Sequence, residues 1–191
     1  MAVSNLALIQ DYILQSAKVI QGLESKASEI GALCEMLIKT IRGGGTIFTC
    51  GNGGSACDAM HFAEELVARY RKDRPGIKAQ HFCDAATITC WANDYNFESV
   101  FERQVQTFAT NKDCLVVFST SGNSPNILRA VEAAKKVGAK SIALLGKDGG
   151  NAKSIADLSL VVDSNYTPHI QQAHIAIVHL ICEQLESTLF P

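Results

Sequence analysis

The chain has 191 residues, of which 47% are hydrophobic and 19% are charged, and its net charge is −2. This length allows a substantial core, and the weak negative charge gives no sign of a nucleic-acid partner. No apolar run approaches the roughly 20 residues that span a bilayer, and the N-terminal segment lacks the basic stretch and cleavage site of a signal peptide. Seven scattered cysteines without a C-x-x-C pair indicate reduced thiols. We therefore expect a soluble cytoplasmic protein without nucleic-acid or membrane partners.

The first quarter of the chain predicts two amphipathic helices, at 3–23 and 26–42, because apolar residues recur there every three or four positions. Three glycines at 43–45 then end the second helix. Beyond them, short apolar runs predict five strands, at 46–50, 77–82, 114–119, 141–146 and 158–162. Helical patterns accompany these strands at 56–70, 98–109, 125–137 and 168–188. Alternating apolar strands and helices predict an α/β fold, a doubly wound five-stranded parallel sheet covered on both faces.

In such a sheet, ligands bind beyond the carboxyl ends of the strands, near the point where the strand order reverses. The first strand ends in the glycine loop GNGGSA, at 51–56, which has three interpretations. It is a tight turn, a short G-x-G-x-x-A dinucleotide fingerprint, or a loop whose bare backbone admits a sugar or phosphate, with Ser55 beside a helix N-terminus. The fingerprint is weak, because the acidic residue that binds the ribose would have to come from the loop RYRKD at 69–73.

The third predicted strand ends in STSGNSPN, at 119–126, where another helical pattern begins. Four hydroxyl residues surround one glycine, although a helix cap needs only one. Hydroxyls, free N–H groups and the positive end of a helix dipole can bind phosphate without lysine. We interpret the hydroxyl loop as a phosphate site made by Ser119, Thr120, Ser121 and Ser124. The later loop at 145–151 lacks the spacing of a P-loop, which disfavours a nucleotide triphosphatase.

Histidines suggest a metal site next to the glycine loop. His61 and Glu65 are one turn apart and share a helix face. The last helix carries further imidazoles, the commonest metal ligand, at His169, His174 and His179, together with Gln171. Gln171 and His174 are neighbours on that helix, whereas Gln171 and His179 are about 12 Å apart along its axis. Spacing alone does not decide which of them would join His61 and Glu65.

Five motifs occur in the order and spacing of phosphoheptose isomerases, a family of the sugar isomerase (SIS) domain superfamily: CGNGGSACDAMHFAEEL, ANDYNFESVF, STSGNSPN, GKDGG and IQQAHIAIVH. The resemblance extends from about residue 44 to 188, and the N-terminal helices fit as well. It implies a single SIS domain over 1–191, a flavodoxin-like three-layer sandwich. Residues 1–42 would be a helical pair used in oligomerisation, and 43–191 an α/β core that ends in a helix.

The resemblance also implies an activity. A homotetramer would convert a small sugar phosphate, D-sedoheptulose 7-phosphate, into D-glycero-D-manno-heptose 7-phosphate through an enediol. This would be the first step towards the ADP- or GDP-heptose used for lipopolysaccharide core or related surface glycans.

The site residues implied by the resemblance include one Zn²⁺ per subunit on His61, Glu65, Gln171 and His179. Glu65 and His179 would also be the acid/base pair, so the resemblance selects His179 over His174. The residues implied to lie beside the substrate are Asn52, Gly53, Gly54, Ser55, Glu65, Asn93, Asp94, Ser119, Thr120, Ser121, Ser124 and Gln171. Two positions depart from the family pattern, which usually reads ARIQE where this chain has PHIQQ: His169 replaces an arginine and Gln172 a glutamate.

Two other functions belong to different classes. A non-catalytic SIS tetramer would bind a sugar phosphate as a regulator, and it would be expected to lose the metal and acid/base side chains that this chain keeps. A nicotinamide-dependent enzyme would bind a dinucleotide, which we do not expect here. Zinc content and cofactor fluorescence of the purified protein would discriminate among the three.

Overall fold

The computed structural model describes residues 5–191, so residues 3 and 4 of the first predicted helix lie outside the described residues. In chain order the elements are α1 (Leu6–Gly22), the 3-10 helix η1 (Leu23–Lys26), α2 (Ala27–Arg42), β1 (Ile47–Gly51), α3 (Gly54–Val67), β2 (Ala79–His81), α4 (Ala85–Asp94), the 3-10 helix η2 (Phe97–Ser99), α5 (Val100–Phe108), β3 (Cys114–Ser119), α6 (Pro125–Val137), β4 (Lys140–Leu145), α7 (Ala152–Ile155), β5 (Leu158–Val161) and α8 (Thr167–Leu189). Within residues 5–191, every helix is too short or too polar to span a bilayer.

The strands form one parallel sheet in the order β2-β1-β3-β4-β5. This confirms the predicted doubly wound five-stranded sheet. β1 and β3 are buried along their whole length, as expected of strands covered on both faces. Because β2 lies on one side of β1 and the later strands on the other, the order reverses between β1 and β3. The carboxyl ends of these two strands therefore define the expected ligand crevice.

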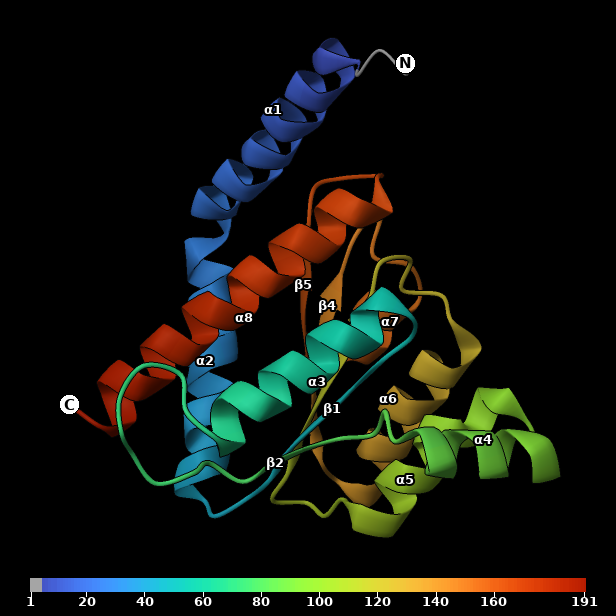
Figure 1. Ribbon diagram of the computed structural model, residues 1–191. Coiled ribbons are helices and arrows are strands. Elements are labelled where there is room, and N and C mark those ends of the chain that lie inside the picture. The colour runs from blue at the N-terminus through green and yellow to red at the C-terminus, as the bar shows by residue number, and fades with distance from the viewer. Residues whose placement is uncertain (1–4) are drawn as a thin grey trace.

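Helices cover the sheet in two layers (Figure 1). On one face, α2, α3 and α8 pack on the sheet around large buried side chains such as Leu37, Phe62 and Ile177. On the other face, α4 to α7 pack around a second cluster that includes Phe101, Ile127 and Ala152. α3 and α8 lie side by side on the first face.

Several boundaries differ from the sequence-based expectation. The helix predicted at 56–70 begins two residues earlier and ends at Val67, because the carbonyl of Leu66 accepts from the side chain of Arg74 and from the N–H of Ile77. The strand predicted at 77–82 pairs only over Ala79–His81. The sequence did not predict α4, which has no buried residue and contains β-branched residues that favour strands.

The first helix has an unusual environment. No residue of α1 is buried, and it projects away from the sheet (Figure 1). Six of its large apolar side chains are 42–65% exposed: Leu6, Leu8, Ile9, Ile13, Leu14 and Ile20. Helix α2, by contrast, contributes Leu33 and Leu37 to the core and ends where predicted, with Gly44 in the left-handed conformation.

Candidate active site

The glycine loop lies directly after β1 and leads into α3. Gly53 has φ of +56°, a conformation that other residues rarely adopt. At Gly54, an added Cβ would come within 2.3 Å of the Nε2 atom of Gln171, so the side-chain amide of Gln171 lies directly against the loop. The loop therefore brings bare backbone and the amide of Gln171 together at the start of α3, where Ser55 is buried in the first helical turn.

The glycine loop is joined to the hydroxyl loop by a pair of amides. Asn52 Nδ2 donates to Asn126 Oδ1, and Asn126 Nδ2 donates to Asn52 Oδ1, each at 2.8 Å. Asn126 is 2% exposed and lies in the first turn of α6. The side-chain amide of Asn52, expected beside the substrate, is thus engaged in connecting the two loops. Sequence reasoning missed Asn126, although it lies within the STSGNSPN motif.

The hydroxyl loop follows β3 at the adjacent strand end. Ser119 is buried, and its Oγ accepts a hydrogen bond of 3.0 Å from the N–H of Gly122. Ser124 is the N-cap residue of α6, but its hydroxyl makes no capping bond. Thr120 and Ser121 are half-buried. Ser121 Oγ likewise accepts a hydrogen bond of 3.3 Å from the N–H of Asn123, so two hydroxyls hold the loop in its own conformation. The hydroxyl of Ser124 has no capping role at the helix N-terminus, where anions bind favourably.

The GKDGG loop after β4 and the two residues that follow it pack against the hydroxyl loop. The N–H of Ala152 donates to the carbonyl of Gly122, and the N–H of Asn151 donates to Asn123 Oδ1, both at 2.9 Å. The two backbones touch so closely that a Cβ on Gly122 would come within 1.9 Å of the carbonyl oxygen of Gly149. This contact gives the GKDGG motif a structural role that the sequence did not reveal.

Three potential metal ligands meet between α3 and α8. One ligand atom from each of His61, Glu65 and His179 lies within 4.8 Å of the others. His61 Nε2 is 3.0 Å from Glu65 Oε1, and the rings of His61 and His179 have centroids 5.3 Å apart. The ring of Tyr70 stacks on His179 with a centroid distance of 6.0 Å. The structure thus joins His179 to the predicted pair, with Tyr70 as a neighbour that sequence reasoning did not single out.

Comparisons with known proteins identify the family of this chain. A model of the SIS domain matches residues 11–146. A phosphoheptose isomerase of Trichlorobacter lovleyi is 44% identical over 183 residues, which cover 95% of this chain and 92% of that protein. The chain belongs to the phosphoheptose isomerase family of SIS domain proteins. Two solved phosphoheptose isomerase structures are each 33% identical to this chain. The structure from Neisseria gonorrhoeae has a TM-score of 0.90, and the match covers 95% of this chain and 98% of that chain. The structure from Francisella tularensis has a TM-score of 0.91, and the match covers 97% of this chain and 100% of that chain.

The other histidines of α8 are not part of the three-residue cluster. His174 is fully buried, and its Nε2 lies 3.2 Å from the carbonyl oxygen of Leu145 at the end of β4. Burial lowers the pKa of His174 from 6.5 to about 4, despite the opposing effect of this hydrogen bond. His174 is therefore a neutral core residue at pH 7.

The two departures from the phosphoheptose isomerase pattern pack against α1. The ring of His169 lies between those of Tyr12 and Tyr166, with a centroid distance of 4.8 Å to each. Gln172 accepts from the hydroxyl of Ser16 and donates to the hydroxyl of Tyr12. Both replacements therefore contribute to the contact between α1 and the first turns of α8.

For Gln171, Asn93 and Asp94 the structure shows other contacts. Gln171 contacts Gly54, two turns of α8 before His179, so its role as a metal ligand stays a prediction. Asn93 and Asp94 are exposed at the end of α4, where Asn93 Nδ2 donates to Asp94 Oδ1. α4 covers the sheet face opposite α3 and α8.

A groove of about 950 Å³ runs between α8 and the N-terminal helices and borders the cluster. Tyr70 and His179 lie on its wall, and most of its other lining is apolar, including Leu23, Ile30 and Leu180. His179 thus lies between the groove and the side chains of His61 and Glu65.

Proposed function

We propose that this protein is a phosphoheptose isomerase that converts D-sedoheptulose 7-phosphate into D-glycero-D-manno-heptose 7-phosphate. The observation that carries the proposal is the full-length relationship to proteins of that name together with the His61–Glu65–His179 cluster, which lies on the helix that follows the glycine loop and on the helix beside it. The product would supply heptose for surface glycans such as lipopolysaccharide core.

The reaction moves a proton between C1 and C2 of the sugar through an enediol. It requires a base near the carbon and an acid near the oxygen. Glu65 and His179 are the two groups we assign to these roles, because they come from different helices and meet with His61. The side chain of Glu65 is 14% exposed, and this partial burial restricts water around the proton that it takes.

Zn²⁺ fits the donor types of the cluster. Two imidazoles and one carboxylate are ligands that zinc accepts, and a catalytic site with three protein ligands keeps a position for substrate or water. Donors of a tetrahedral zinc shell lie about 3.4 Å apart, close to the spread of 4.8 Å or less among these ligand atoms. We propose that His61, Glu65 and His179 hold one zinc ion per subunit, with Gln171 the predicted fourth ligand. Bound zinc would supply Lewis-acid stabilisation of developing negative charge on oxygen.

The far end of the substrate is assigned to the hydroxyl loop. Thr120, Ser121 and Ser124 would donate to the phosphate at the N-terminus of α6, while Ser119 shapes the loop. Gly53, Gly54 and the amide of Gln171 would face the sugar near the glycine loop. Asn93 and Asp94 remain predicted substrate contacts, and their exposure on α4 is compatible with a contribution to a neighbouring subunit.

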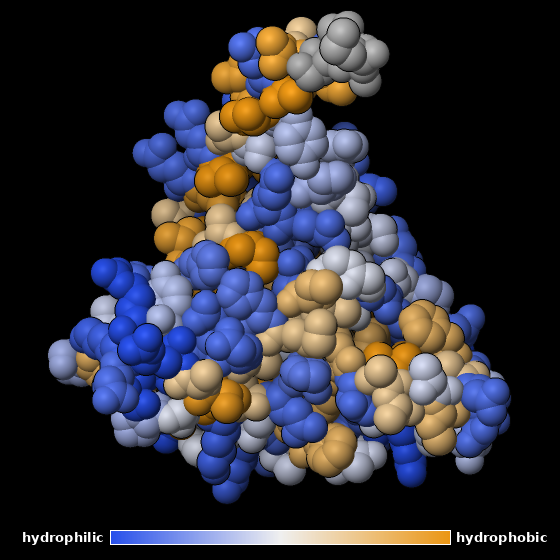
Figure 2. Space-filling model, in the orientation of Figure 1, coloured by the Kyte–Doolittle hydropathy of each residue, from blue (hydrophilic) through white to orange (hydrophobic). Residues whose placement is uncertain are grey.

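The proposed assembly is a homotetramer. Apolar side chains gather over α1, which projects from the body of the protein (Figure 2). An exposed apolar helix of this kind is typical of a surface covered by another protein. The groove beside His179 is continuous with this surface, because Ile20 at the end of α1 lines it. Subunit contacts there would bring the active sites close to subunit boundaries.

The proposed compartment is the cytoplasm. All seven cysteines lie in the described part of the chain and are free, four of them buried. Reduced thiols are typical of cytosolic proteins.

Incubation with sedoheptulose 7-phosphate tests the proposal, with formation of the aldose followed directly. We expect turnover that a strong chelator abolishes and Zn²⁺ restores. Absence of turnover in the zinc-loaded protein would contradict the isomerase function. Full turnover in a protein shown to be metal-free would contradict the role of zinc but not the isomerase function.

A further inference from the structure

A buried ion pair lies beneath the cluster. Arg74 Nε donates to Glu186 Oε1 at 2.9 Å, and the two side chains are only 2% and 5% exposed. The guanidinium also donates to the carbonyl oxygens of Glu65 at 2.8 Å, Leu66 at 2.9 Å and Pro75 at 3.2 Å. Four of its five N–H donors are therefore satisfied, in the forked geometry that only arginine offers.

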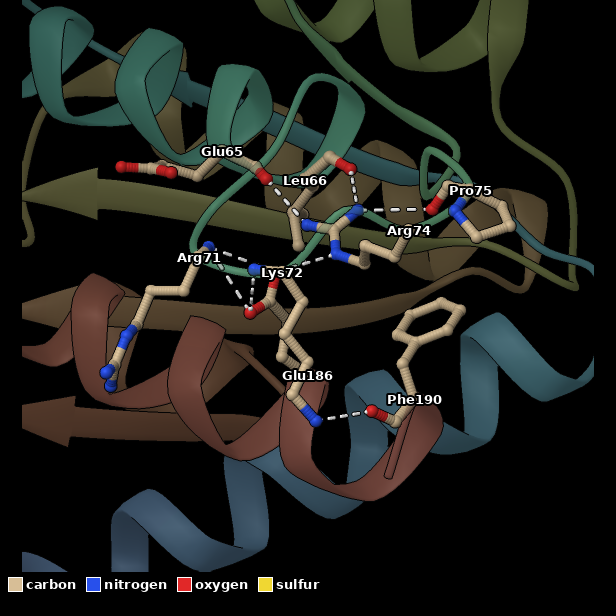
Figure 3. Close-up of polar contacts among 8 residues, drawn as sticks. All are labelled: Glu65, Leu66, Arg71, Lys72, Arg74, Pro75, Glu186 and Phe190. Carbon is tan, nitrogen blue, oxygen red and sulfur yellow. Dashed lines mark hydrogen bonds and ion pairs between the residues drawn. The ribbon is translucent and has the colours of Figure 1, made fainter.

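The pair connects the two helices that carry the cluster (Figure 3). Arg74 binds carbonyls of the last turn of α3, which have no partner within the helix. One of these carbonyls belongs to Glu65 itself, whose carboxylate points away from Arg74 (Figure 3). Glu186 lies on α8, seven residues after His179.

The same segment, residues 70–74, holds α8 at further points. Glu186 also accepts from the backbone N–H groups of Arg71 and Lys72, at 3.1–3.3 Å. Lys72 Nζ donates to the carbonyl of Phe190 at 2.6 Å. Tyr70, at the start of the segment, stacks on His179. We call residues 70–74 the clasp, because the guanidinium of Arg74 in this segment binds α3 through the carbonyls of Glu65 and Leu66 and binds α8 through Glu186.

A buried ion pair is a poor way to gain stability, because desolvation offsets most of the attraction. Its directional hydrogen bonds do fix relative positions. Mutation of groups that orient metal ligands typically costs about 10- to 100-fold in metal affinity or activity. We propose that Arg74 and Glu186 are positioning residues, which set the separation of Glu65 from His179 and so the geometry of the acid/base and metal-binding cluster. This inference rests on the proposed isomerase function.

The test compares Arg74→Lys with the wild-type protein. Lysine keeps the positive charge but loses the fork that reaches both Glu186 and the carbonyl of Glu65. We expect a folded protein by circular dichroism, with its kcat and its affinity for Co²⁺ each at least tenfold lower and its KM within about twofold. The visible spectrum of bound Co²⁺ should also change, because it reports the arrangement of the ligands.

Two controls separate positioning from stability. Arg71→Lys alters an exposed contact with Glu183 on the same clasp, but it leaves α3 untouched, and it should keep the wild-type kcat and Co²⁺ affinity. Val131→Ala removes core volume on the other face of the sheet, and it should lower the melting temperature without changing either quantity. Should Arg74→Lys fail to fold, Glu186→Gln keeps the shape of the pair and serves the same comparison.

Unchanged Co²⁺ affinity and kcat in the folded variant, with only a lower melting temperature, would overturn the positioning role. A wild-type protein that isomerises no heptose phosphate would instead overturn the proposed function. In that event the Co²⁺ affinities and spectra would still decide whether the clasp positions the cluster.

Discussion

Replacing His174 with glutamine should flatten the pH dependence of stability on the acidic side. The pKa of His174 falls from 6.5 to about 4 on folding, because the ring is buried. Between these values the unfolded chain binds a proton that the folded protein does not, so stability is lost as pH falls through this range. Each pKa unit corresponds to 1.36 kcal/mol, and the full loss is therefore about 3 kcal/mol, of which about 2 kcal/mol is reached at pH 5.

The assay is urea unfolding at pH 7 and pH 5, at one protein concentration because assembly contributes to apparent stability. Wild type should lose about 2 kcal/mol more between the two conditions than His174→Gln. Ile177→Val is the matched control, since this buried residue of α8 does not titrate and its variant should keep the wild-type slope. Equal slopes for wild type and His174→Gln would refute the reasoning.

Three further predictions concern the site and the assembly. Thr120→Ala combined with Ser121→Ala should raise KM at least tenfold, because each lost hydrogen bond to a charged group is worth about 1.5–3 kcal/mol, and an unchanged KM would place the phosphate elsewhere. Glu65→Gln should lower kcat by about 10²–10⁴-fold while circular dichroism is unchanged, and wild-type turnover would exclude Glu65 as the base. Deleting residues 1–22 should dissociate the tetramer in light scattering, whereas a monomeric full-length protein would remove the basis for that prediction.

Much of the fold could be predicted because its signals are local. The buried strands β1 and β3 are continuous apolar runs, and α2 carries regular apolar spacing that ends at glycines. Helix α4 was missed because it is short, has no fully buried residue, and contains β-branched residues that favour a strand. The end of α3 was also misplaced, since it depends on Arg74, whose contact with Leu66 is tertiary.

The candidate site could likewise be predicted only where its contacts are local in the sequence. His61 and Glu65 share a helix turn, so their proximity follows from sequence spacing. The choice between His174 and His179 depends on how α8 is rotated against the sheet, which spacing along one helix does not determine. Likewise, Asn126 meets Asn52 across 74 residues of chain, and no local pattern encodes that pairing.

The paired amides of Asn52 and Asn126 bear on the entropy of binding. The two hydrogen bonds hold the glycine loop and the hydroxyl loop together, and Asn126 is almost completely buried. A ligand that bridges the two loops would lose less free energy to ordering them, because that ordering takes place during folding. The pair is also uncharged, so the spacing of the loops does not depend on a titrating group and should stay the same across the pH range in which the protein is folded.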